Sequence, residues 1–514
     1  MSKRKYWLWT FVGFLIILFC ALFLRLYRLD LIPVFADEAI YVRWAQVMRA
    51  EPSLRFLPLS DGKQPLFMWS IIPFLKILED PLVAGRVVSV ATGLGTTCGV
   101  FVLAYVLFKS RKVSLLASLL YALSPFAVFF DRMALVDSML SFFGVWALIF
   151  MVQAIKELNL GLSLLSGFAL GGALLTKSPA LLFTLFLPLT AVFTPLKEEG
   201  GKLLSLAKAV GLITAALVVS YALYNILRLG ENFHMIGSRN YDYVYPYGHI
   251  LERPLDPLLP HLDRILTWFE VMGPAAVIIL ASLGALINFA RYKKEIILLL
   301  VFGALPLFIQ SEYAKVLTSR YFFFTLPPLV VLAASSLKKF KKTPQLYVVY
   351  TLVVFFFVQA ILFYVPFFSD PARASWPEKA GYLADWTAGV GIKETAELIV
   401  ARRDADLSKK IVVGTEGYFG TLPDGLQIYL EKEPNITVVG VGLDLKAVPT
   451  SLLESVAAGN VTFWVANASR LSFARRFEEY GLEVIASYEK TEDDKGQIDI
   501  FYVFEVSSDA LGKL

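Results

Sequence analysis

Composition places this chain among integral membrane proteins. Of its 514 residues, 57% are hydrophobic and only 18% are charged, whereas soluble globular proteins contain about 25% charged residues. This composition excludes a disordered chain, a collagen and a disulfide-rich scaffold, since the two cysteines, Cys20 and Cys98, both lie in apolar runs. The net charge of +5 does not indicate a nucleic-acid partner.

About eleven apolar runs are long enough, or nearly so, to cross a hydrocarbon core that needs about 20 helical residues. In chain order they cover residues 6–27, 84–108, 113–130, 134–155, 160–177, 179–196, 206–227, 268–290, 295–311, 320–337 and 345–367. The first run is too long for a signal peptide and lacks a small-residue cleavage pattern, so we expect it to remain as a span. Lys177, Ser178 and Pro179 predict a tight turn between two spans.

Basic residues are distributed unevenly over the connections between these runs. If the N-terminus lies in the cytoplasm, the inner connections contain Lys109, Arg111, Lys112, Lys156, Lys197, Lys202, Lys208, Arg291, Lys293, Lys294, Lys338, Lys339, Lys341 and Lys342. The short outer connections contain only Arg132, Lys177, Lys315 and Arg320. This asymmetry follows the positive-inside rule, so we expect a protein of the cell (plasma) membrane with a cytoplasmic N-terminus.

The tail after about residue 368 has the composition of a soluble domain. Predicted helices at 391–405, 416–431, 450–458 and 470–480 alternate with predicted strands at 411–414, 436–440, 461–466, 483–488 and 498–505. Such alternation favours a layered α/β domain with a largely parallel sheet. The sequence thus predicts a polytopic α-helical membrane domain (1–367, with outer loops 28–83 and 228–267) and an extracytoplasmic α/β domain (368–514).

The expected outer face collects ionisable residues, which are costly to place at membrane spans and are therefore functional candidates. They are Asp37, Glu38, Lys63, Arg86, Arg132, Asp137, Lys177 and Arg320, with Tyr321 beside the last. A carboxylate could take a proton from a hydroxyl, and the cations could hold a phosphate leaving group. Structural interpretations also stand, such as an Asp137–Arg132 pair at a helix start or an interfacial anchor at Arg86.

Five short motifs contain most of these candidates. They are Asp37-Glu38, Lys63-Gln64-Pro65-Leu66, Arg132-Met133-Ala134-Leu135-Val136-Asp137, Leu175-Thr176-Lys177-Ser178-Pro179, and Arg320-Tyr321 followed by Pro327-Pro328. Over roughly residues 5–340, they resemble the motifs of GT-C type glycosyltransferases that use a polyprenyl-phosphate sugar, in the branch of the protein O-mannosyltransferases and the aminoarabinose-lipid A transferases. Each motif alone is short, and the signal lies in their order on one expected face.

The resemblance implies an inverting transfer of a sugar from a polyprenyl-phosphate carrier to an acceptor hydroxyl outside the cytoplasm. It implies that Asp37 is the general base, that Glu38 supports it, and that Asp137 orients the acceptor or assists a metal. The residues expected to hold the lipid phosphate are Lys63, Arg86, Arg132, Lys177, Arg320 and Tyr321. The partners would be the lipid-linked donor, membrane lipids, and a protein, lipid or glycan acceptor.

The sequence departs from the family at Gln64, where Pro is common, and at Asp61-Gly62, which replaces an acidic residue next to Lys. A metal site in that loop is therefore not expected, although a divalent cation stays open as a cofactor. His234, His249 and His261 match no local ligand spacing and are interpreted as ordinary loop histidines.

Two other classes of function compete with the enzyme. A transporter or flippase for a lipid-linked glycan would typically show internal repeats and sites near the bilayer midplane, whereas these charges lie at the outer ends of the runs. A membrane anchor with a binding tail would need only one span. The loop 414–420 follows a strand but lacks the Lys-Ser/Thr of a phosphate loop, so nucleotide binding is not expected.

Overall fold

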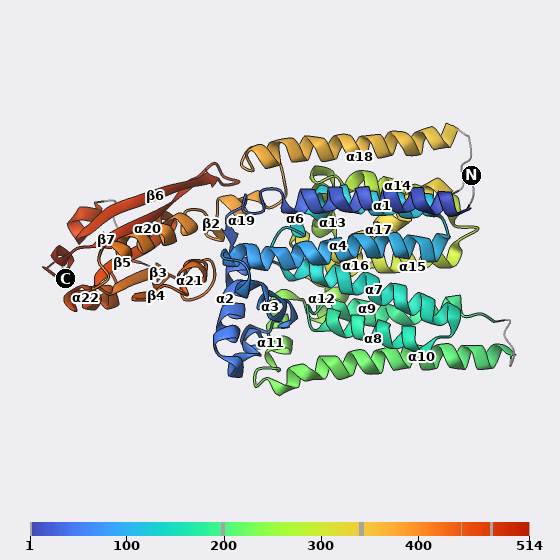
Figure 1. Cartoon of the computed structure of the whole chain (residues 1–514), viewed down its shortest axis with the longest axis horizontal. Coiled ribbons are helices and arrows are strands. Elements are labelled where there is room, and N and C mark those ends of the chain that lie inside the picture. The colour runs from blue at the N-terminus through green and yellow to red at the C-terminus, as the bar shows by residue number, and fades with distance from the viewer. Residues whose placement is uncertain (1–2, 197–200, 339–343, 444, 473–475, 513–514) are drawn as a thin grey trace.

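The computed structural model describes residues 3–196, 201–338, 344–443, 445–472 and 476–512. A bundle of long helices forms one part of the molecule. A sheet with its own helices forms the other part, at the end of the bundle away from the N-terminus (Figure 1). Short helices lie between the two parts, and they include the chain segment that contains Asp37.

The helices of the bundle follow the apolar runs of the sequence. They are α1 (Lys3–Leu26), α4 (Pro81–Phe108), α5 (Arg111–Leu123), α6 (Pro125–Phe130), α7 (Val136–Glu157), α8 (Leu160–Leu174), α9 (Ala180–Phe186), α10 (Gly201–Tyr224), α13 (Leu258–Val271), α14 (Pro274–Asn288), α15 (Lys293–Gly303), α16 (Leu305–Tyr313), α17 (Leu326–Ala334) and α18 (Pro344–Ser369). Among the described residues, seven helical segments are long and apolar enough to cross a membrane, or eight if one bent pair counts as a span.

The number of unbroken spans is smaller than the eleven runs suggested, although each run is largely helical. The run 113–130 is divided into α5 and α6 at Pro125, and the run 179–196 into α9 and a 3-10 helix, Leu187–Phe193. Proline cannot donate the hydrogen bond that continues an α-helix, so these runs become short segments. In the bent pair, the two helices meet at 106° around Gly273, whose φ is +83°.

The C-terminal part contains a mixed sheet. Its elements are α19 (Lys379–Leu383), β2 (Ala388–Gly389), α20 (Ile392–Ala405), β3 (Ile411–Glu416), α21 (Asp424–Leu430), β4 (Ile436–Gly442), α22 (Thr450–Ala457), β5 (Val461–Asn467), β6 (Leu482–Glu492) and β7 (Ile498–Val506). Within the described residues the main sheet has five strands in the order β4-β3-β5-β7-β6. All five predicted strands are thereby confirmed.

The sheet is less parallel than the alternating pattern suggested. β3 pairs in parallel with β4 and β5, but β7 is antiparallel to both β5 and β6. The turn between β6 and β7 is closed by Asp493, whose carboxylate accepts the backbone N–H of Lys495 and Gln497. The helix expected at 470–480 is replaced by 3-10 turns at Ala468–Arg470 and Phe477–Tyr480, with residues 473–475 outside the described ranges.

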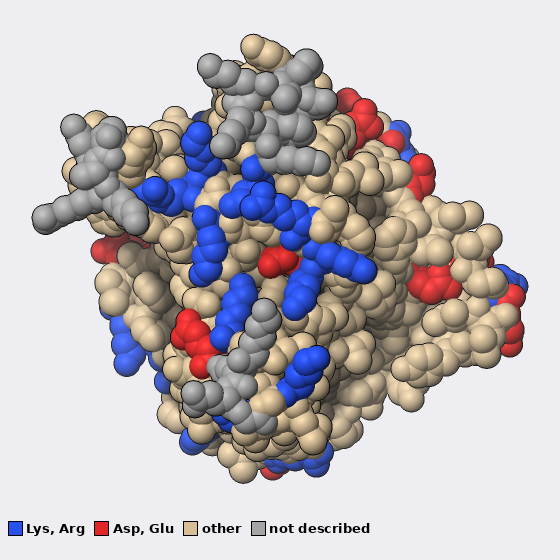
Figure 2. All heavy atoms as spheres, turned by 90° about the vertical axis from the view of Figure 1, so that its right-hand side faces the viewer, with Lys and Arg blue, Asp and Glu red and all other residues tan. Residues whose placement is uncertain are grey.

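Two strands join the parts of the molecule. β1 (Val34–Phe35) precedes α2 (Ala36–Ala50) and pairs antiparallel with β2, which lies on the way from α18 to the sheet. The helix α2 also packs against α21. At the other end of the bundle, where α1 begins, most of the charged side chains on view are Lys and Arg (Figure 2). The basic face and the C-terminal part thus lie at opposite ends of the bundle.

A buried ion pair holds α1 inside this bundle. The guanidinium of Arg25 donates to the Asp131 carboxylate at 2.8 and 2.9 Å, and neither side chain is exposed. Ser138 donates to the same carboxylate at 2.5 Å, and a Cβ on Gly93 of α4 would lie 2.3 Å from it. Since burying charges is costly, this pair depends on having both partners and these hydrogen bonds in place.

Asp131→Ala should destabilise the protein, because it leaves the Arg25 guanidinium buried without its carboxylate. The loss expected for a broken buried pair is about 3–5 kcal/mol, which would lower the midpoint of thermal denaturation in detergent. Glu479→Ala, which removes an exposed partner of Arg476, is the matched control and should leave the midpoint nearly unchanged. Equal midpoints for the two variants would contradict the structural role of the pair.

Candidate active site

Asp37 lies in the first turn of α2, at the end of the bundle that faces the C-terminal part. Its carboxylate contacts the Arg320 guanidinium at 2.5 Å and the Lys63 ammonium at 3.4 Å. Burial alone would raise the pKa of Asp37, but the two cations outweigh it and hold that pKa well below its usual value. Asp37 is thus an ionised carboxylate that two cations clamp.

Lys63 is the second point of this cluster. Its ammonium also pairs with Asp61 at 3.1 Å and lies over the rings of Tyr41 and Trp44, at 5.4 and 5.7 Å. Burial would lower the pKa of Lys63, but Tyr41 and the carboxylates of Asp37 and Asp61 raise it above its usual value. Lys63 is therefore a fixed positive charge with an aromatic surface beside it.

Asp137 and Lys177 form a second pair next to the first. The Lys177 ammonium donates to Oδ1 of Asp137 at 2.7 Å and lies 4.5 Å from the centre of the Tyr321 ring. The Arg320 guanidinium lies over the same ring at 5.7 Å, so Tyr321 connects the two pairs. The other oxygen of Asp137, Oδ2, is buried and has no hydrogen-bond partner among the described residues.

The cluster gathers three cations around its carboxylates. Lys63, Lys177 and Arg320 contact Asp37 and Asp137, and Lys63 shares Asp61 with Arg239. Cations that turn from their carboxylates can bind an anion, and a buried carboxylate oxygen without a partner can accept a hydrogen bond from a hydroxyl group.

Glu38 and Arg86 differ from the sequence prediction. The Arg86 guanidinium donates to both carboxylate oxygens of Glu38 at 2.7 and 2.8 Å, and its remaining donors bind backbone oxygens of Leu29, Ile32 and Pro33. Glu38 also accepts the backbone N–H of Ala134. Both side chains are buried and fully bonded, so the geometry assigns them to fixing the start of α2 and leaves no donor for a phosphate.

Arg132 also differs from its prediction as a phosphate ligand. Its guanidinium is buried and donates to the backbone oxygens of Leu24, Arg25, Tyr27 and Arg28. These are carbonyl groups at the end of α1, which lack partners inside the helix. Arg132 therefore caps α1, a role that its place in the motif could not reveal.

A cavity of about 320 Å³ adjoins the cluster. Its lining residues are Gln64, Leu174, Ser178, Leu181, Tyr224, Phe233, His234, Ile236, Gly237 and Asn240. Gln64 follows Lys63 in the chain and donates to the hydroxyl of Ser178, which follows Lys177. Two residues of the cavity wall are thus chain neighbours of cluster cations, and the wall combines apolar and polar groups.

The described residues contain no group of three or more His, Cys, Asp and Glu side chains arranged to hold a metal ion. The two carboxylates of the cluster already pair with side-chain cations, so they do not fit a metal site, and we derive no step through a metal. The expectation of loop histidines is wrong for two of the three: His249 lies in α12 (Tyr247–Glu252), where it stacks on Tyr245, and His261 lies in α13, where its ring contacts the backbone oxygen of Ser311.

Sequence reasoning missed one carboxylate near the cluster. Glu378, in the segment after α18, accepts both the backbone N–H and the hydroxyl of Ser319, the residue before Arg320. No local motif marks Glu378, because its contact spans 59 residues of the chain. It could have been found only from the fold.

Comparisons with known proteins show which family and which folds this chain is similar to. Residues 62–224, which include Lys63, Asp137 and Lys177, match the dolichyl-phosphate-mannose-protein mannosyltransferase family. No curated protein matches the sequence. The fold is similar to that of ArnT from Cupriavidus metallidurans in the apo state, with a TM-score of 0.59, 14% identity and 99% of both chains covered.

Two further structures share the fold. ArnT from Cupriavidus metallidurans bound to undecaprenyl phosphate gives a TM-score of 0.54 at 15% identity, again with 99% of both chains covered. The Archaeoglobus fulgidus oligosaccharyltransferase in the apo form gives 0.52 at 12% identity, with 99% of this chain and 75% of that chain covered. The resemblance to the GT-C type glycosyltransferases is confirmed, and the chain is an integral membrane protein with their fold.

The neighbours Asp37 and Glu38 should respond differently to substitution. Glu38→Ala leaves the Arg86 cation buried without a carboxylate, so it should lower stability by about 3–5 kcal/mol. Asp37→Ala should be milder, because Lys63 keeps its pair with Asp61 and the side chains of this cluster are partly exposed. Thermal denaturation of the two purified variants in detergent measures the difference, and equal loss of stability would contradict it.

Proposed function

We propose that this protein transfers a sugar from a polyprenyl-phosphate donor to a hydroxyl group of an acceptor. The observation that supports this most is the contact of Asp37 with both Arg320 and Lys63. It combines a carboxylate that can accept a proton with two cations that can bind phosphate. The match to a mannosyltransferase family and the fold shared with ArnT, solved with undecaprenyl phosphate bound, support the class of donor.

The reaction is proposed to take place outside the cytoplasm. The basic face at the start of α1 is the face that the positive-inside rule assigns to the cytoplasm of a plasma-membrane protein (Figure 2). The cluster lies toward the other end of the bundle, next to the C-terminal part (Figure 1). The bundle, residues 1–367, is thus proposed as the catalytic domain and residues 368–514 as an extracytoplasmic domain.

The charge of the cluster suits this donor. A polyprenyl-phosphate sugar is a phosphodiester with a single negative charge, which Lys63, Lys177 and Arg320 can bind as they turn from their carboxylates. When the bond to the sugar breaks, the departing polyprenyl phosphate gains a second negative charge. Lys63, Lys177 and Arg320 are placed to stabilise that added charge, with Arg320 able to bind two phosphate oxygens at once.

The proposed step is a direct displacement at the anomeric carbon. The acceptor oxygen forms a bond to that carbon from the face opposite the phosphate, so the configuration inverts as the carbon–oxygen bond to phosphate breaks. The bonding electrons leave with polyprenyl phosphate, and the hydroxyl proton passes to Asp37. The unpartnered Oδ2 of Asp137 is placed to accept a hydrogen bond from a hydroxyl of the sugar or acceptor.

Donor binding would itself activate Asp37. While Arg320 and Lys63 clamp its carboxylate, Asp37 is a weak base, because its pKa is held low. A phosphate group competes for the same two cations. As they turn toward the phosphate, Asp37 loses their stabilisation and its pKa rises toward the usual value, which makes it a better base. The donor is therefore expected to bind before the acceptor loses its proton.

The cavity beside the cluster is proposed to receive the sugar and the first part of the lipid chain. Its lining joins the polar groups of Gln64 and Ser178 to apolar side chains such as Leu181 and Phe233. A sugar needs a few well-placed polar groups, and a prenyl chain needs an apolar surface. The cavity offers both next to Lys63 and Lys177.

The first test is a transfer assay with membranes that contain wild-type protein or Asp37→Asn. Labelled polyprenyl-phosphate sugars are offered one at a time with an extract of acceptors. Wild type should move label to an acceptor. Asp37→Asn should lose at least about 100-fold in rate, as expected when a general base is removed. Asp404→Asn, a surface substitution in the C-terminal part, is the matched control and should transfer at the wild-type rate.

The same assay separates the enzyme from a flippase. A flippase would move labelled carrier across the membrane of sealed vesicles without consuming it. Neither wild type nor Asp37→Asn would then transfer label to an acceptor. Full transfer by Asp37→Asn would overturn the role of its carboxylate while leaving the enzyme class intact.

A further inference from the structure

The segment between α18 and the main sheet contacts the residues that precede Asp37 and Arg320 in the chain. This segment covers residues 370–391 and contains α19 and β2. It makes one hydrogen-bonded contact beside Asp37 and another beside Arg320, as described below. The two catalytic side chains come from distant parts of the sequence, so a single segment that holds both can set their distance.

The first contact fixes the backbone before Asp37. The N–H of Ala36 donates to the backbone oxygen of Thr387 at 3.0 Å. Immediately before it, Val34 pairs with Gly389 and Phe35 with Ala388 in the β1–β2 ladder. The start of α2 is therefore tied to this segment by backbone hydrogen bonds, which do not depend on the identity of the side chains.

The second contact fixes the backbone before Arg320. Oε2 of Glu378 accepts the N–H of Ser319 at 3.0 Å and its hydroxyl at 2.6 Å. Glu378 has a φ of +58°, which is uncommon for a residue other than glycine and persists only where the surroundings hold it. Burial raises the pKa of Glu378, while the hydrogen bonds to Ser319 and the Arg320 charge oppose this rise.

Phe35 connects the two contacts. Its ring stacks on Tyr382 of α19 at 4.5 Å between centres, and the Arg320 guanidinium lies over the Phe35 ring at 5.7 Å. Arg320 thus contacts Phe35 through the aromatic ring and Asp37 through its charge, and Glu378 holds the preceding residue, Ser319.

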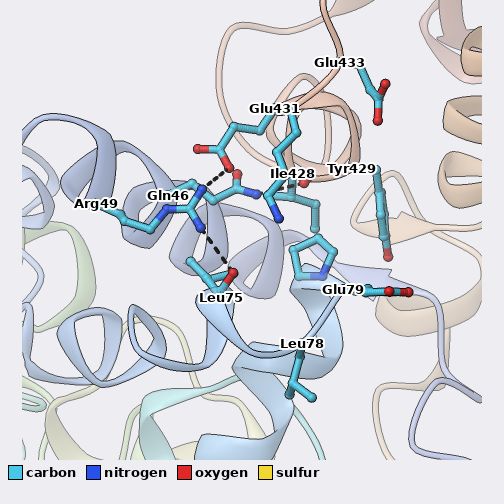
Figure 3. A pocket seen from close by; sticks show the side chains of 11 residues that line it. Gln46, Arg49, Leu75, Leu78, Glu79, Ile428, Tyr429, Glu431 and Glu433 are labelled. Atoms are coloured by element: carbon cyan, nitrogen blue, oxygen red, sulfur yellow. Dashed lines mark hydrogen bonds and ion pairs between the residues drawn. The ribbon is translucent and has the colours of Figure 1, made fainter.

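The far half of α2 is held by the sheet domain as well. The side-chain amide of Gln46 donates to the backbone oxygen of Ile428 at 2.8 Å, and Arg49 pairs with Glu431 at 2.9 Å. Figure 3 shows these side chains around a small polar pocket between α2 and α21. Because α2 is held at both ends, the distance between Asp37 and Arg320 depends mainly on where Arg320 is held.

We propose that Glu378 is a positioning residue that sets the Arg320 guanidinium against Asp37 and the donor phosphate, and that the C-terminal part thereby completes the active site. This proposal rests on the proposed function. Glu378 acts through the backbone of Ser319 and does not itself touch substrate. The C-terminal part then contributes to the structure of the catalytic centre, in addition to any surface that it offers to the acceptor.

The test compares Glu378→Ala, Glu378→Gln and Ser319→Ala in the full-length protein. Glu378→Ala should lower kcat/KM for the donor by about 10- to 100-fold, since small displacements of catalytic groups cost that much. Glu378→Gln keeps one acceptor oxygen and should recover most of the rate. Ser319→Ala keeps the backbone N–H and should lose only a few-fold. Glu505→Gln, at a half-buried carboxylate of β7 that pairs with Arg402 away from the cluster, is the matched control.

Binding supplies a readout that is independent of transfer. Undecaprenyl phosphate, with undecaprenol as the phosphate-free probe, is titrated against each variant by thermal shift. Glu378→Ala should bind the phosphate about tenfold more weakly and bind undecaprenol as wild type does. Wild-type kcat/KM and phosphate affinity in folded Glu378→Ala would overturn the proposal. If wild type binds the phosphate but transfers no sugar, the proposed function fails while the positioning role is still decided by binding.

Discussion

The contact between Asp37 and Arg320 is the interaction on which the rest of the active site depends. These residues belong to α2 and to the 3-10 helix before α17, far apart in the chain. Lys63 adds a second cation to Asp37, and Tyr321 links Arg320 to the neighbouring pair of Lys177 and Asp137. The carboxylates hold the cations in place while no anion is bound, and the cations keep Asp37 ionised. A donor phosphate would compete with these carboxylates for the cations.

Two kinds of ion pair occur in and at the end of the helix bundle, and they differ in whether all their polar atoms already have hydrogen-bond partners. Arg25–Asp131 and Arg86–Glu38 are buried, with further hydrogen bonds on both partners, so their geometry is closed to a ligand. Asp137 has a buried oxygen without a partner among the described residues, and the Asp37 pair has a neighbouring cavity. Saturated pairs hold helices together, and unsaturated pairs are where chemistry is proposed.

The sequence predicted the elements of the fold well because helices and strands leave local periodic patterns. The apolar runs became helices and the five strands of the tail were found in the structure. Prolines inside the runs shortened several spans, and β7 reversed direction because a tight turn at Asp493 joins it to β6. A periodic pattern of apolar residues does not show the effect of such single residues on the length or direction of an element.

The site was predictable in part. Charges at the ends of apolar runs marked Asp37, Lys63, Asp137, Lys177 and Arg320, and the structure brings all five together. The same signal also marked Arg86 and Arg132. A sequence does not show that the N–H donors of these two guanidinium groups already bind backbone carbonyl oxygens. Glu378 gave no signal, since its role depends on a contact with Ser319 that only the folded chain creates.

The most direct test of this account is the affinity of Asp37→Asn for undecaprenyl phosphate. Removing the carboxylate frees Arg320 and Lys63 for the phosphate and removes a like charge from its site. The account predicts that Asp37→Asn binds undecaprenyl phosphate more tightly than wild type, by about tenfold or more, although it cannot transfer sugar. Weaker or unchanged binding would show that Arg320 and Lys63 are not shared between Asp37 and the donor, and would contradict the central claim.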